Sequence, residues 1–206
     1  MNKTKENVFV SIDVESTGDS PSTSSCVMIG CVVFRNIDVM KETSDAEWIV
    51  DKKRWCIEEI PGRPMSDRCY REFWSKNQEL WKYIKSHAVD AKTAMKSFSD
   101  WYSHLLSSYN CTFIARPSSF DWQWINCIYD EFGPDNKPPL PFSIICISSI
   151  IKSFGFIGLN WENIIKPHLD NQKYVMTHYA DDDALYQAYI FVKTIAWLKN
   201  NMCIKN

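Results

Sequence analysis

The sequence of 206 residues has no Cys-x-x-Cys pair, no apolar stretch of membrane-spanning length and no excess of basic residues. Its eight cysteines are scattered, and several lie in apolar runs where a free thiol behaves as a small hydrophobe, which disfavours a zinc site or a disulfide framework. The first residues are too polar for a signal peptide. The net charge of -2 gives no general attraction to polyanions. We therefore expect a reduced, soluble, cytoplasmic protein without membrane contact.

The composition is that of an ordinary globular domain. Hydrophobic residues make up 45% of the chain and charged residues 23%, and this length is enough to bury a full core. The sequence contains no repeat, low-complexity tract or linker that would divide it. We therefore expect residues 1–206 to form a single domain.

Hydrophobic periodicity predicts strands that come first and then alternate with helices. The expected strands are 7–14, 25–35, 47–50 and 111–115. The expected helices are 67–87, 91–107, 119–131 and 181–199. The apolar segment 142–154 fits a strand, a helix or both. This order predicts an α/β domain with a mixed central β-sheet flanked by helices.

Two acids, Asp13 and Glu15, end the first apolar run. Residues at i and i+2 of a strand point to the same face. A buried strand keeps two like charges there only if a cation neutralises them, whereas a solvated strand face carries them without a metal. Asp121 follows strand 111–115 and is either an ordinary acid at a helix N-terminus or a further metal ligand.

Three consecutive acids, at positions 181–183, precede the last apolar helix. Three consecutive acids exceed what one helix cap needs, because like charges repel one another, and we expect Asp181 to be the cap. His178 lies five residues before Asp183. A lone histidine is most often structural or solvated, but one beside clustered acids is a candidate for proton transfer near a metal.

Together these blocks resemble the DEDDh branch of the DnaQ-like 3'-5' exonucleases. The matching residues are Asp13-x-Glu15 with Ser16-Thr17-Gly18, Phe120-Asp121, and His178-x-Ala180-x-x-Asp183-Ala184. They occur in the order of the family, although the Asn that often precedes the middle Asp is replaced here by residues 117–119. Residues 72–78 are faintly similar to a subgroup that holds T-even phage exodeoxyribonuclease A and a mycobacterial exoribonuclease.

The resemblance implies a ribonuclease H-like fold and a hydrolase that acts on the 3' ends of single-stranded DNA or RNA and releases nucleoside 5'-monophosphates. It implies two Mg²⁺ ions, for which Mn²⁺ can substitute. The implied metal ligands are Asp13, Glu15, Asp121 and Asp183, with His178 as the general base. The implied substrate contacts are Ser16, Thr17 and Gly18 in the turn after the first strand, with Trp74 and Trp122 as stacking partners.

Other interpretations stay open. A DnaQ-like module without activity could bind nucleic acid or act as a scaffold, but all five catalytic positions are filled. A ribonuclease H-like endonuclease leaves His178 unexplained, and a metal-free binding protein leaves the clustered acids unexplained. Residues 52–54, with Arg63, Arg68 and Arg71, form either a backbone-binding strip or an ordinary charged surface. A homodimer is left open as well.

Overall fold

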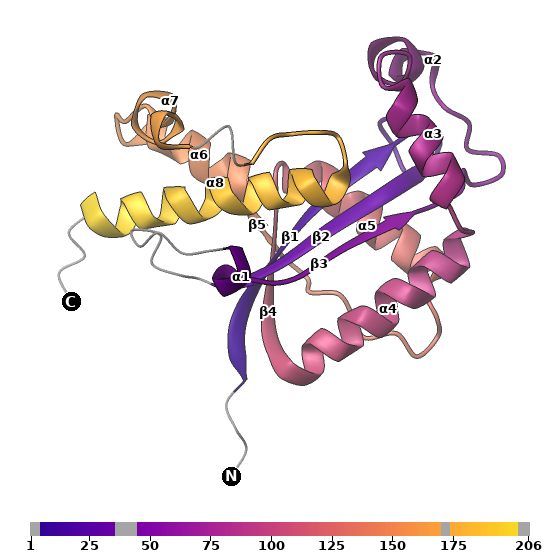
Figure 1. The fold of residues 1–206 in the computed structure, drawn as a ribbon, viewed down its shortest axis with the longest axis horizontal. Helices are drawn as coiled ribbons and strands as arrows, with labels where there is room; N and C mark the ends of the chain where they lie inside the picture. Colours follow the sequence, from indigo (N-terminus) through magenta and orange to yellow (C-terminus); the bar gives the residue numbers. More distant parts are fainter. Residues whose placement is uncertain (1–4, 36–44, 170–173, 202–206) are drawn as a thin grey trace.

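The structure, a computed structural model, describes residues 5–35, 45–169 and 174–201, and it is built around one mixed sheet (Figure 1). The strands are β1 (Glu6–Ser16), β2 (Cys26–Arg35), β3 (Ile49–Cys56), β4 (Tyr109–Ala115) and β5 (Ile145–Cys146). Their spatial order is β3-β2-β1-β4-β5. β2 is antiparallel to β1 and β3, whereas β4 is parallel to β1 and β5. β1, which carries the first two acids, therefore lies in the centre.

Helices cover both faces of this sheet. They are α1 (Asp45–Trp48), α2 (Asp67–Cys69), α3 (Gln78–His87), α4 (Ala91–Ser108), α5 (Ser118–Phe132), α6 (Ile147–Phe156), α7 (Trp161–Ile164) and α8 (Ala180–Asn201), with a π-helical turn η1 (Tyr70–Trp74) and a 3-10 turn η2 (Lys166–His168). α8 crosses one face against β1 and β2, and α4 and α5 pack on the other (Figure 1). The expected α/β architecture with a mixed, helix-flanked sheet is confirmed.

The two faces of β1 have different tasks. One face packs against α4 and α5 through Val8, Val10, Ile12 and Val14. Because side chains alternate along a strand, the other face, which α8 covers, carries Phe9, Ser11, Asp13 and Glu15. The apolar residues of β1 thus anchor the strand in the core, and its two acids point into the layer below α8.

Gly30 of β2 allows α8 to approach the sheet closely. It is the register partner of Asp13. A Cβ atom at this position would lie 2.0 Å from the carbonyl carbon of Ala180 and 2.1 Å from the backbone nitrogen of Asp181. Such contacts are impossible for a real side chain, so glycine here lets the first turn of α8 sit directly beside Asp13.

Two expected elements differ from those observed. The strand expected at 47–50 is wrong at its start, because residues up to Trp48 form α1 and the strand runs from Ile49 to Cys56. Its charged middle is tolerated because β3 is an edge strand. The helix expected at 67–87 is split into α2, η1 and α3, since the chain leaves the helix after Trp74. The segment 142–154 is both strand and helix, as β5 and α6.

Among the helices of the described ranges, none combines the length and hydropathy that a membrane span requires. The cysteines from Cys26 to Cys146 are free thiols, as expected. Cys203 lies outside the described residues.

Candidate active site

The first two acids of the site come from the end of β1. Glu15 is followed by a register shift in the pairing of β1 with β2, between Glu15 and Ser16. Bulges of this kind re-aim a side chain and are frequent beside active sites. The Glu15 side chain is 12% exposed. Both acids are therefore held on a rigid central strand with restricted access to water.

The other two acids come from helix N-termini. Asp121 lies in the first turn of α5 and is 3% exposed, and Asp183 lies in the first turn of α8 and is 1% exposed. The positive end of a helix dipole favours an anion at such positions. The third of the consecutive acids, Asp183, is thus the one that lies beside Glu15 and His178.

Asp183 also fixes the loop that carries His178. One oxygen of Asp183, Oδ1, accepts hydrogen bonds from the backbone N–H of Thr177 at 2.7 Å and of His178 at 3.2 Å. The other oxygen, Oδ2, lies 3.9 Å from Nδ1 of His178. The same Nδ1 lies 4.0 Å from Oε1 of Glu15. One carboxylate therefore holds the loop with one atom and faces the imidazole with the other.

His178 has an unusual backbone conformation. Its φ is 63°, in the left-handed region that non-glycine residues rarely adopt. The imidazole packs edge-on against the ring of Phe73, with ring centroids 4.9 Å apart and an interplanar angle of 87°. Strained backbone of this kind is concentrated at functional sites. The side chain is 43% exposed, so solvent and substrate can reach it.

The four carboxylates repel one another in a dry environment. Burial raises the pKa of Asp13 well above its ordinary value, and the charges of the other three acids raise it further. Burial, followed by the charges at positions 183 and 121, raises the pKa of Glu15 in the same way. Burial raises the pKa of Asp121 to about 8, and it also raises the pKa of Asp183. Cations at this position would favour the ionised carboxylates and therefore lower these pKa values.

The donor set suits a hard divalent cation. Ligand atoms of Glu15, His178 and Asp183 all lie within 4.8 Å of one another. Oδ2 of Asp121 is buried and has no hydrogen-bond partner among the residues that the structure describes. Carboxylate oxygens are the ligands that Mg²⁺ and Mn²⁺ prefer. The residues present therefore fit the metal site that the sequence predicted.

Comparisons with known proteins relate the chain to exonucleases. No family model matches the chain. Over 199 residues it is 25% identical to the 3'-5' DNA exonuclease Cap18 of Escherichia coli, covering 92% of each chain. The nuclease domain of 3'hExo, a DEDDh family member bound to rAMP, superposes with a TM-score of 0.61 at 16% identity, covering 95% of this chain and 94% of the other. A full-length 3'-exonuclease superposes with a TM-score of 0.58 at 17% identity, covering 96% and 84%.

The chain has a DEDDh exonuclease fold. The predicted ribonuclease H-like fold is confirmed by these structures, and the resemblance to DnaQ-like 3'-5' exonucleases is confirmed by the sequence relative together with them. These findings support an enzyme of this type. The narrower likeness to the subgroup with the phage enzyme stays a prediction.

The expectation that Asp181 caps α8 is wrong. Its carboxylate, in a side chain 10% exposed, pairs with Nε of Arg54 and lies 3.0 Å from Nζ of Lys52. The Arg54 guanidinium lies over the rings of Tyr83 and Tyr179, at 5.2 and 4.5 Å from their centroids. Asp181 thus ties the start of α8 to β3 and to the residue after His178.

These ion pairs also bear on the basic residues at positions 52–54, 63, 68 and 71, which were expected to form either a strip that binds the nucleic-acid backbone or an ordinary charged surface. Arg54 and Lys52 pair with acids of α8, Arg63 with Glu131 at 2.7 Å, and Arg68 with acids that include Asp19. These cations are engaged within the protein, which favours an ordinary charged surface over a strip dedicated to the nucleic-acid backbone.

We predict that Asp183→Asn and Asp181→Asn will fail in different ways. Asp183→Asn removes a charge that faces His178, so turnover should fall sharply while the fold persists. Asp181→Asn leaves Arg54 without its charged partner, so the free energy of unfolding should fall by about 1.5–3 kcal/mol, the value of a hydrogen bond to a charged group. Urea unfolding and single-turnover assays of the two variants separate the effects. Equal losses of activity at equal stability would contradict the assignment.

The end of β1 and the turn after it are held by hydrogen bonds from residues 66 and 74. The Ser16 carbonyl accepts from Nε1 of Trp74 at 3.0 Å, and the Thr17 carbonyl accepts from Ser66 N–H at 2.9 Å. A Cβ on Gly18 would lie 2.2 Å from Oγ of Ser24. Glycine is therefore required here by internal packing. Contact of residues 16–18 with a nucleotide stays a prediction.

The two candidate stacking residues differ. Trp74 is 1% exposed, so its ring offers no face to a base, and the expected stacking role is wrong. Its task is to brace the turn at Ser16. Trp122 is half-buried beside Phe113, at 5.3 Å between ring centroids, and its contact with substrate stays a prediction. Trp124 is 1% exposed and belongs to the core.

Sequence reasoning missed two residues of the site, Phe73 and Gln187. Phe73 lies on the π-helical turn and contacts His178, which no sequence period indicates. Gln187 donates from Nε2 to Oδ1 of Asp13 at 2.6 Å. Gln187 follows Asp183 by four residues, so the two side chains lie on the same face of α8. A polar residue on the buried face of an otherwise apolar helix is a sequence signal that indicates a site residue.

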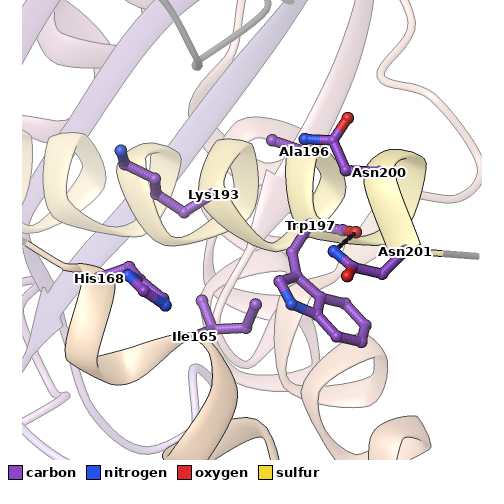
Figure 2. Close-up of a pocket in the computed structure, with 7 residues that line it drawn as sticks. All are labelled: Ile165, His168, Lys193, Ala196, Trp197, Asn200 and Asn201. Carbon is purple, nitrogen blue, oxygen red and sulfur yellow. Dashed lines mark hydrogen bonds between the residues drawn. The ribbon is translucent and has the colours of Figure 1, made fainter.

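A separate pocket lies far along α8 and contains none of the candidate acids. Figure 2 shows it between the C-terminal half of α8 and the 3-10 turn, with Trp197 and Ile165 facing each other across it and Lys193 and His168 at one end. Lys193 lies almost three helical turns beyond Asp183. The pocket is therefore distinct from the site on β1.

Proposed function

We propose that this chain is a Mg²⁺-dependent 3'-5' exonuclease that removes nucleoside 5'-monophosphates from single-stranded DNA or RNA. One observation carries the proposal: four buried or half-buried carboxylates from β1, α5 and α8 interact with one another beside a partly exposed histidine. The similarity to a 3'-5' DNA exonuclease over most of both chains supports the same reaction.

The acids would form the binding site for two cations. Asp13 would be the ligand shared by both ions; burial raises its pKa most, and the charges of Asp121, Glu15 and Asp183 raise it further. Bound divalent cations supply charge neutralisation on the phosphate and activation of the attacking water. The rigid strand and the helix N-termini keep the carboxylates in position before substrate arrives.

His178 would accept the proton of the attacking water. Its imidazole is the exposed group of the site, and it is 3.9–4.0 Å from the carboxylates of Asp183 and Glu15. The edge-on contact with Phe73 limits rotation of the imidazole ring. A base held this way is ready for proton transfer without a large rearrangement.

The proposal is tested with 5'-labelled oligonucleotides. With Mg²⁺, a single strand should shorten to a ladder of 3'-truncated products, released as nucleoside 5'-monophosphates, and EDTA should stop the reaction. DNA and RNA oligomers of the same sequence should both be tested, because the sequence relative is a DNA exonuclease whereas one structural neighbour is bound to rAMP. The faster reaction identifies the preferred sugar. A circular single strand is the control.

Two outcomes would overturn the proposal. Cleavage of the circular strand would indicate an endonuclease. Binding of the linear strand without any product, in protein that takes up Mn²⁺ or Mg²⁺, would indicate an inactive binding module.

A further inference from the structure

The side-chain amide of Gln187 contacts the carboxylate cluster through Asp13. Gln187 is 3% exposed and lies on α8 one turn after Asp183. Its Nε2 donates to Oδ1 of Asp13 at 2.6 Å. A buried amide at this distance is a strong and directional contact, because the acceptor is a carboxylate and water does not compete.

The other end of the same amide has no partner. Oε1 of Gln187 is buried and accepts no hydrogen bond in the described part of the chain. A buried carbonyl oxygen without a donor costs free energy, and such atoms call for a structural or functional explanation. Because Oε1 and Nε2 share one carbon atom, the free oxygen also lies next to the carboxylate cluster. It is therefore placed to accept from a water molecule held between the acids.

A neutral donor is the type of group that this position needs. Lys or Arg would also hold Asp13, but a positive charge there would compete with the cations for the carboxylates. Glutamine fixes the orientation of one oxygen of Asp13 and leaves the total negative charge of the cluster unchanged. The second oxygen of Asp13 is then presented in a constant direction.

We propose that Gln187 is a positioning residue for the metal site: its amide orients Asp13 and accepts from a water of the bound ions. The inference rests on the proposed function and deepens it. Outer partners of metal ligands orient the ligands, and their loss commonly weakens metal affinity or activity about 10–100-fold.

The test compares two buried substitutions on the same helix. Gln187→Met keeps the length of the side chain and removes both polar atoms. The control is Thr194→Val, because Thr194 is 1% exposed and its Oγ1 accepts from Nε1 of Trp161 at 3.0 Å, away from the acids. Both variants lose a buried hydrogen bond of α8, but only Gln187→Met should affect the metal.

Titration of the metal-free proteins with Mn²⁺, followed by calorimetry and by the electron paramagnetic resonance of free Mn²⁺, measures affinity without turnover. Gln187→Met should bind Mn²⁺ about 10–100-fold more weakly than the wild type, and the Mn²⁺ concentration for half-maximal hydrolysis should rise by the same factor. Thr194→Val should melt at a lower temperature with unchanged Mn²⁺ affinity.

The outcomes separate this inference from the proposed function. Equal Mn²⁺ affinity in Gln187→Met and wild type would overturn the role of Gln187 and leave the nuclease proposal intact. Equal weakening by Thr194→Val would show a general structural effect and would also overturn it. A wild-type protein that binds no Mn²⁺ would overturn both.

Discussion

Asp13→Asn is expected to abolish phosphodiester hydrolysis and to make the metal-free protein more stable. The substitution removes one charge from a group whose pKa is raised by burial and by three neighbouring carboxylates, so repulsion in the metal-free protein is relieved. The loss in turnover should exceed the roughly 100-fold that loss of an outer partner costs. In a protein of this size, each kcal/mol of relieved repulsion corresponds to a rise of roughly 2–4 °C in melting temperature.

The stability of the metal-free protein should also depend on pH in a defined direction. The pKa of Asp121 is about 8 in the folded chain, above the value of about 3.9 for an unfolded Asp. Between these values the folded state binds more protons than the unfolded state, so stability falls as pH rises through this window, by at most about 1.4 kcal/mol per pH unit for each group. The metal-free wild type should therefore melt higher at pH 6 than at pH 8.

Scanning calorimetry at both pH values checks these expectations. Asp121→Asn should flatten the pH dependence, and saturating Mg²⁺ should reduce it in the wild type. Asp100→Asn is the matched control, because Asp100 is an exposed acid on α4 whose partner is Lys96. It should leave both activity and the pH dependence unchanged. A large loss of stability in metal-free Asp13→Asn would show instead that the acids have a structural role.

His178→Asn is expected to lower turnover about 10²–10⁴-fold, the usual cost of removing a positioned base. Asparagine is chosen because φ is 63° at this position, and Asn tolerates the left-handed region better than Ala does. The variant should therefore keep the loop and the first turn of α8. Binding of Mn²⁺ and of a single-stranded oligonucleotide should persist, since the four acids are intact.

Rates at saturating Mg²⁺ with a 5'-labelled single strand measure this effect. His104→Asn, on the exposed side of α4, is the control and should hydrolyse at the wild-type rate. The acidic limb of the pH–rate profile should flatten in His178→Asn if the imidazole is the base. Near-normal turnover of His178→Asn at neutral pH would exclude this role.

The elements that pack through one periodic apolar face were predictable from the sequence. The centres of β1, β4, α4, α5 and α8 all agree with the structure. The π-helical turn was not predictable, because its rings serve two separate targets: Phe73 contacts His178 and Trp74 supports Ser16. Hydrophobic periodicity indicates which single face of an element is buried, so it does not indicate two neighbouring residues that contact different parts of the protein.

For the site, strand alternation placed Asp13 and Glu15 on one face of β1, whereas Asp183 was added to the same site by the resemblance to the DEDDh exonucleases. It could not distinguish a helix cap from an ion pair at Asp181, since the partner, Arg54, comes from a distant strand. Burial of Trp74 was equally hidden. In each case the role of the residue depends on a contact with a residue far away in the sequence, which the local sequence does not indicate.

The site joins opposite ends of the described chain. Asp13 and Glu15 lie on the first strand, whereas His178, Asp183 and Gln187 belong to the last helix and the loop before it. During synthesis on a ribosome, the strand emerges long before α8 is made. A nascent chain, or one cut short before α8, has no complete set of acids, so the proposed nuclease activity requires that α8 has docked over Gly30. The order of synthesis thus delays the proposed hydrolysis of nucleic acid until α8 has packed onto the sheet.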